Sequence, residues 1–121
     1  MEPMTLRKTA AKPGGDLLQG TLDMLVLQAL RIAPAHGYTI ARVLEQRSDA
    51  FLKVEQGSIY PALNRLEDRG WVESYWATSE NNRRARFYKL TARGRRQLRQ
   101  ESEQWDRVVK AIGLVMRPVE E

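Results

Sequence analysis

The amino-acid sequence predicts a mainly α-helical fold with a small β-hairpin, an α+β arrangement, and one long helix at its C-terminal end. Three observations favour this fold: helical spacing of apolar residues in segments before residue 70, two β-prone runs around an asparagine-containing turn, and a narrow apolar stripe over residues 98–116. With 121 residues and no cysteine, the chain is expected to bury a single core without disulfide bonds.

The chain divides into three parts by composition. Residues 1–15 are polar, contain Pro3 and Pro13 and show no apolar period, so we expect a flexible N-terminal arm there. Residues 16–90 hold the predicted short helices and the hairpin, and residues 91–117 hold the long final helix.

Two helices are expected at the start of the second part. The first is capped by Asp16 and stopped by Pro34. Its apolar residues lie three and four positions apart: Leu18, Leu22, Leu25, Val26, Ala29, Leu30 and Ala33. The second helix follows His36 and ends at residues 48–49. Residues 51–54 are β-prone and predict a short strand.

The third helix has an apolar side formed by Ile59, Leu63 and Leu66. We expect Ser58 to be its N-cap, because Pro61 is then the third helical residue and no backbone hydrogen bond is lost. Gly70 stands where a left-handed residue is needed after the helix.

A β-hairpin is expected next. Residues 71–77 and 84–90 are extended runs, and residues 79–82 supply the types that tolerate left-handed backbone in a turn. Neither run alternates cleanly between apolar and polar residues, so the register of the hairpin stays open.

The final helix begins after Thr91, which is expected to cap it. An apolar seam with steps of four and three residues averages the 3.5-residue repeat by which helices pair. The seam consists of Leu98, Ser102, Trp105, Val109, Ile112 and Met116, and Val108 widens it. We infer a homodimer formed through this helix; the alternative is a stripe that packs back on its own domain.

The order of the elements predicts a winged helix-turn-helix followed by a dimerisation helix. The β-hairpin is the wing of this fold. The distribution of charge agrees. The chain has 20 basic and 15 acidic residues, but no acidic residue interrupts residues 83–99, which contain Arg83, Arg84, Arg86, Lys89, Arg93, Arg95, Arg96 and Arg99. Such a patch is expected where a protein meets phosphates, so residues 16–90 are interpreted as a DNA-binding domain. A solvated surface is the alternative.

Four motifs carry a family resemblance: LLQGTLD at residues 17–23, HGY at 36–38, GSIYPAL at 57–63 and RRARFYKLT at 83–91. In this order they resemble the PadR family of bacterial transcriptional regulators, and one helix after the wing is similar to its short members. The resemblance implies a winged-helix homodimer that binds a palindromic operator, usually as a repressor relieved by a small molecule.

Residues that contact double-stranded DNA are expected on the third helix and the wing. Asn and Arg side chains can bond bidentately to base edges, and cationic wing residues suit phosphates or the minor groove. The candidates are Tyr38, Ser58, Tyr60, Asn64, Arg65, Asn82, Arg83, Arg84 and Arg86. Three alternatives stay open: Arg65 pairs with Glu67 or Asp68, Tyr38 fills the core, and Tyr60 packs or touches phosphate.

Trp105 lies in the middle of the seam, where it would meet its symmetry mate. Two indoles there could hold a planar apolar small-molecule effector. The resemblance adds that some short relatives bind aromatic effectors between subunits. A packed interface tryptophan without an effector is the alternative.

Several functions are disfavoured by composition. A single histidine, His36, and no cysteine argue against a metal site, a cofactor or a catalytic constellation, so we do not expect an enzyme. Neither a membrane-spanning segment nor a secretory signal is expected, and a cytoplasmic location follows. The alternative function is a winged-helix protein-interaction module without specific DNA binding.

Overall fold

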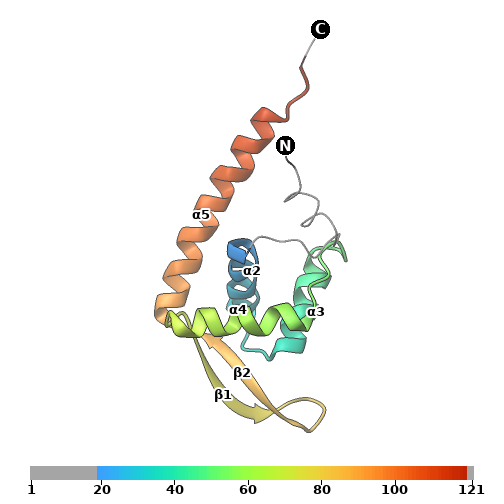
Figure 1. The fold of residues 1–121 in the computed structure, drawn as a ribbon, viewed down its shortest axis with the longest axis vertical. Coiled ribbons are helices and arrows are strands. Elements are labelled where there is room, and N and C mark those ends of the chain that lie inside the picture. Colours follow the sequence, from blue (N-terminus) through green and yellow to red (C-terminus); the bar gives the residue numbers. More distant parts are fainter. Residues whose placement is uncertain (1–18, 120–121) are drawn as a thin grey trace, which may run out of the picture.

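Three short helices, a two-stranded hairpin and one long helix follow one another in residues 19–119, the part of the chain that this computed structural model describes (Figure 1). The predicted arm at residues 1–15 and the Asp16 cap lie outside the described residues. The elements are α2 (Gln19–Ile32), α3 (Gly37–Arg47), α4 (Gln56–Asp68), β1 (Val72–Thr78), β2 (Arg84–Leu90) and α5 (Ala92–Val115). This order confirms the predicted winged helix-turn-helix with a long helix after the wing.

The core lies where α2, α3 and α4 pack against one another. Leu27 of α2, Ile40 of α3 and Ile59 and Leu63 of α4 are completely buried. Burial of side chains of this size contributes about 1.5–3 kcal/mol each relative to exposure. The predicted apolar sides of the three helices are therefore the sides that hold the domain together.

The predicted N-cap of α4 is wrong. The helix begins at Gln56 with Glu55 as N-cap, so Ser58 and Pro61 lie inside it. Because Pro61 has no backbone N–H, the Gly57 carbonyl loses its i+4 donor. Gly57 is exposed, so solvent can reach that carbonyl and the cost stays small.

A junction of backbone and side-chain hydrogen bonds joins the end of α4 to the start of α5. Gly70 adopts a φ of +77°, and the amides of Gly70 and Trp71 donate to the carbonyls of Glu67 and Leu66, as in a Schellman motif. The Thr91 hydroxyl donates to the Gly70 carbonyl at 2.6 Å and accepts from the Gly94 amide at 3.0 Å. The left-handed residue after α4 and the Thr91 cap are both as predicted.

The hairpin pairs Val72 with Leu90 at its base and Thr78 with Arg84 at its tip. On its other edge β2 pairs with Ala35, since Ala35 and Tyr88 exchange backbone hydrogen bonds of 3.1 and 2.9 Å. This bridge ties the wing to the turn between α2 and α3. The strand expected at residues 51–54 does not form: within residues 19–119 this segment has no strand pairing partner, and the Leu52 amide donates to the Ser48 hydroxyl instead.

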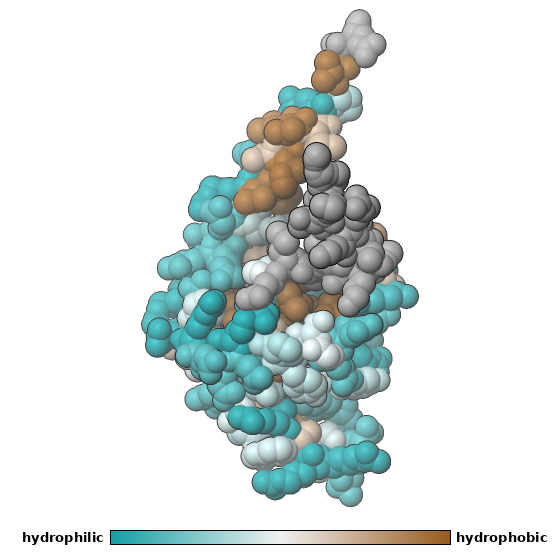
Figure 2. Space-filling model, viewed as in Figure 1, coloured by the Kyte–Doolittle hydropathy of each residue, from teal (hydrophilic) through white to brown (hydrophobic). Residues whose placement is uncertain are grey.

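Helix α5 has two halves with different surroundings. Its first half packs against α2 and buries Leu98 in the domain core, so the structure corrects the assignment of Leu98 to the dimer seam. The second half projects past the other helices (Figure 1). There, Trp105, Val109 and Ile112 are 44%, 48% and 54% exposed. Figure 2 shows hydrophobic side chains gathered along this half, while most of the remaining visible face is hydrophilic.

Replacing Gly94 by alanine should lower the free energy of unfolding by about 1–3 kcal/mol, because its new Cβ would overlap the Trp71 carbonyl oxygen. Chemical denaturation monitored by circular dichroism measures the change. The matched control is Gly57→Ala, where a Cβ meets nothing within 4 Å and stability should not fall. Equal stability of the Gly94 variant and the wild type would contradict this close packing.

Candidate nucleic-acid interface

The exposed side of α4 forms a ridge opposite its buried side. Gly57, Pro61 and Asn64 follow at steps of four and three residues, and Asp68 continues the ridge at the last turn. Small residues in the first turns permit a close approach of the helix to another surface. The acidic residue at the far end disfavours phosphates there, so the N-terminal part of the ridge is the part suited to DNA.

Arg65 does not face this ridge. Its Nη2 and Nε donate to the two carboxylate oxygens of Asp23 on α2, at 2.6 and 3.3 Å. These hydrogen bonds raise the pKa of the Arg65 guanidinium from its usual value, against the opposing effect of burial. The predicted base contact of Arg65 is therefore corrected: its guanidinium is used inside the domain, with a partner other than the two carboxylates considered from the sequence.

Asp23 is the functional neighbour that the sequence analysis missed. It is buried, with only 5% of its surface exposed, and lies within the apolar face of α2. A signal was available, because Asp23 precedes Leu27 and Leu30 by four and seven residues and thus shares their side of the helix. A carboxylate at such a position needs a cationic partner.

The start of α3 lies against α4 through a glycine. A Cβ on Gly37 would stand 2.6 Å from Cζ of the Tyr60 ring, so glycine allows this ring to lie across the start of α3. Tyr38 and Tyr60 are both about half exposed, with 48% and 43% of their surface accessible. The Arg42 guanidinium lies 5.8 Å from the Tyr38 ring centre and adds a positive charge that the sequence analysis did not single out.

One face of the wing combines arginines with aromatic rings. Arg84 lies over Trp76 at 5.3 Å, and Arg86 lies over Tyr88 at 5.9 Å. Burial raises the pKa of the Tyr88 phenol, while the charge of Arg86 acts in the opposite direction. The Arg84 side chain therefore rests on an exposed indole near the tip, where it is available to a phosphate.

Glu67 connects the wing to α4. Its carboxylate accepts a hydrogen bond from the Ser74 hydroxyl at 2.8 Å and lies 3.6 Å from Nη2 of Arg86. The positive charge of Arg86 is thus paired with the Glu67 carboxylate of α4. Asn82, Arg83 and Arg84 are exposed at the tip. Asn82 has a φ of 59°, the left-handed conformation expected for the turn.

The other wing face packs toward His36. The rings of Tyr75 and Phe87 stack at 5.8 Å, and His36 meets Phe87 edge-on at 5.1 Å. The Nε2 atom of His36 also lies 3.3 Å from the Thr39 hydroxyl. His36 is therefore a packing residue at the N-cap position of α3.

Neither a metal site nor a membrane span is found in residues 19–119. This range contains no group of three or more His, Cys, Asp or Glu residues suited to holding a metal ion. Its helices are all too short or too polar to cross a bilayer.

Comparison with protein families identifies the family of this chain. The model of the transcriptional regulator PadR-like family matches residues 26–100, from the middle of α2 to the first half of α5. A relative from Lysinibacillus sphaericus, described as uncharacterised, is 24% identical over 105 residues, which cover 87% of this chain and 96% of the relative.

Solved structures give the same result over a larger part of the chain. A transcriptional regulator from Clostridium thermocellum is 26% identical, with a TM-score of 0.73 over 81% of this chain and 92% of that one. A PadR-family transcriptional regulator from Eggerthella lenta is 29% identical, with a TM-score of 0.69 over 96% of this chain and 91% of that one.

Replacing Arg65 by methionine should lower the free energy of unfolding by about 2 kcal/mol, because the buried Asp23 carboxylate would lose its charged hydrogen bonds. Equilibrium denaturation measures this loss, and the double variant Asp23→Leu/Arg65→Met should recover part of it. The control is Asn64→Ala at the adjacent exposed position, with a change within about 0.5 kcal/mol. An Arg65 variant as stable as this control would show that the ion pair is not structural.

Proposed function

The chain belongs to the PadR-like family of transcriptional regulators, and we propose on this premise that it is a homodimeric repressor of a palindromic operator, relieved by a small molecule. It is thus a DNA-binding regulator of transcription. The observation that carries the finer proposal is the position of an exposed α4 ridge beside a cationic wing, both held by contacts to the same domain.

Two sets of residues have different roles in this proposal. Asn64 on the α4 ridge reads base edges in the major groove, with Ser58 and Tyr60 beside it. The cationic and polar wing residues Asn82, Arg83, Arg84 and Arg86, together with Tyr38, contact the sugar-phosphate backbone or the minor groove. Exposure of these side chains supports both roles.

We propose that residues 16–90 form the DNA-binding domain and that residues 91–117 form the dimerisation helix. The dimer forms through the exposed half of α5, with the seam residues Trp105, Val109 and Ile112, the C-cap Met116, and Val108 half-buried beside them. Burial of such a stripe against a second copy removes it from water. A two-fold axis there presents two α4 helices to successive half-sites of a palindrome.

The proposed effector is a planar apolar molecule near Trp105. A cavity of about 350 Å³ is lined by Trp105 and Val108 of α5 and by Thr21 and Met24 of α2, among others. Its volume falls within the range of small-molecule sites. An aromatic ligand between these helices would change how α5 leaves the DNA-binding domain, and thus the separation of the two α4 helices in the dimer.

Two variants separate phosphate contact from base recognition. Arg84→Ala should weaken binding to all DNA sequences alike and lower the salt slope by about one. Asn64→Ala should change base preference at one operator position, by about 1–3 kcal/mol. Gel shifts with DNA upstream of the gene, at several salt concentrations, measure both.

The control for both variants is Arg107→Ala, which removes a charge from α5 outside the wing, where Arg107 donates to Gln104. It should leave affinity and base preference as in the wild type. Binding that is insensitive to salt and to the Arg84 and Asn64 changes would overturn the proposed DNA contacts.

The double variant Trp105→Ala/Ile112→Asp should be monomeric, because it removes the largest side chain of the exposed stripe and places a charge within it. Sedimentation velocity at micromolar concentrations measures the effect. The control Arg107→Gln/Lys110→Gln changes exposed polar residues of the same helix and should remain dimeric. A full-strength dimer of the Trp105/Ile112 variant would place the interface elsewhere.

A further inference from the structure

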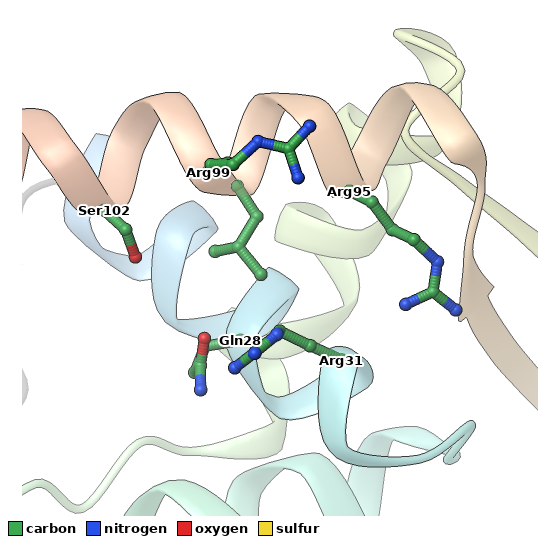
Figure 3. Close-up of a pocket in the computed structure, with 6 residues that line it drawn as sticks. Gln28, Arg31, Arg95, Arg99 and Ser102 are labelled. Atoms are coloured by element: carbon green, nitrogen blue, oxygen red, sulfur yellow. The ribbon is translucent and has the colours of Figure 1, made fainter.

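A basic cavity lies between α2 and the first half of α5 (Figure 3). It has a volume of about 380 Å³ and is lined by Gln28, Arg31, Arg95, Leu98, Arg99 and Ser102. Its α5 residues follow at steps of three, one and three, which places them on one side of the helix. The two α2 residues are three apart and face them. The cavity is separate from the proposed DNA contacts and from Trp105.

Three arginines and no acidic residue line this cavity. Within residues 19–119, none of the three guanidinium groups lies within salt-bridge distance of a carboxylate. With three cationic side chains and no carboxylate in its lining, the cavity attracts an anion electrostatically. Arg65 differs from these three arginines, because its guanidinium forms an ion pair with the Asp23 carboxylate.

The other lining groups restrict the chemistry of the occupant. Figure 3 shows Arg95 and Arg99 extending from α5 and Arg31 lying on α2 next to Gln28. Guanidinium groups bind carboxylate and phosphate oxygens through paired hydrogen bonds. The Gln28 amide and the Ser102 hydroxyl add neutral hydrogen-bonding groups, while buried Leu98 supplies an apolar wall.

We propose that the cavity binds a small anion that carries phosphate or carboxylate groups. Its volume lies in the range of small-molecule sites. The anion would neutralise the arginines of both helices and hold α2 and α5 together at this point.

Helix α2 connects the anion cavity to the proposed DNA-binding surface on α4. It carries Arg31 at the cavity and Asp23 two turns earlier, where Asp23 holds Arg65 of α4. An anion that clamps α2 to α5 therefore acts on the helix that positions α4, and should change the affinity for the operator. This regulatory step rests on the proposed function, whereas anion binding does not.

Isothermal titration of the full chain tests the binding, with inorganic phosphate and citrate as separate probes at constant ionic strength in chloride buffer. We expect saturable binding of at least one probe, with one site per chain. Binding of phosphate alone indicates a phosphate compound and binding of citrate alone a carboxylate. The Arg95→Gln/Arg99→Gln variant should bind at least tenfold more weakly.

The matched control is Arg107→Gln/Lys110→Gln, which removes the same charge from the same helix outside the cavity and should bind like the wild type. Circular dichroism establishes that both variants are folded. Absence of saturable binding of both probes, or an equal loss in both variants, would overturn the proposal.

Two further measurements separate an anion from other occupants. Without added phosphate or citrate, the Arg95/Arg99 variant should bind DNA with the wild-type salt slope. A slope lower by one to two would mean that these arginines contact the DNA backbone, which overturns the proposal. If the monomeric Trp105→Ala/Ile112→Asp variant binds phosphate and the wild type does not, a partner subunit fills the cavity in the dimer. This result also overturns the proposal.

The regulatory step is tested by gel shifts with and without the bound probe. A severalfold change in operator affinity is expected for the wild type and the Arg107/Lys110 control, and not for the Arg95/Arg99 variant. An equal change in all three proteins would be a general salt effect and would refute the regulatory step. Complete absence of DNA binding would refute the proposed function while leaving the titration result intact.

Discussion

The ion pair between Asp23 and Arg65 is the contact on which the arrangement of the domain depends. A nearly buried carboxylate in the core is tolerated only with a cationic, hydrogen-bonded partner. Both carboxylate oxygens accept from the Arg65 guanidinium, which fixes the rotation of α4 about its axis as well as its distance from α2. With Ile59 and Leu63 directed into the core, the same rotation leaves Asn64 exposed.

Helix α2 is the common support of the other functional parts. Its C-terminal turn leads to Ala35, whose backbone pairing with Tyr88 holds the wing. It also packs against the first half of α5, where Leu98 enters the core. The proposed DNA contacts, the proposed dimerisation helix and the basic cavity are thus all supported by a single helix. Small shifts of α5 relative to α2 would be transmitted to α4 and the wing because these elements share packed contacts.

Local rules predicted most elements and failed where tertiary contacts outweighed them. The helical spacing of apolar residues, the Thr91 cap and the left-handed positions at Gly70 and Asn82 depend on neighbours in the sequence, and the structure agrees with them. The predicted start of α4 was wrong because the free energy lost with one exposed hydrogen bond at Pro61 is small compared with the free energy gained by packing the helix. Residues 51–54 have strand-forming side chains, but nothing in the described fold pairs with them.

The sequence alone determined the order of the helices and the hairpin, the apolar stripe of the last helix and the basic run around the wing, because these are properties of period, turn chemistry and charge along one chain. Only the tertiary structure decided which arginines are used inside the domain. Arg65 and Asp23 are 42 residues apart, and the arginines of the basic cavity come from α2 and α5, the first and last helices of the described residues. The partner of a charged side chain depends on the groups that folding brings close to it. Spacing rules relate residues only a few positions apart in the sequence, so they do not predict such a partner.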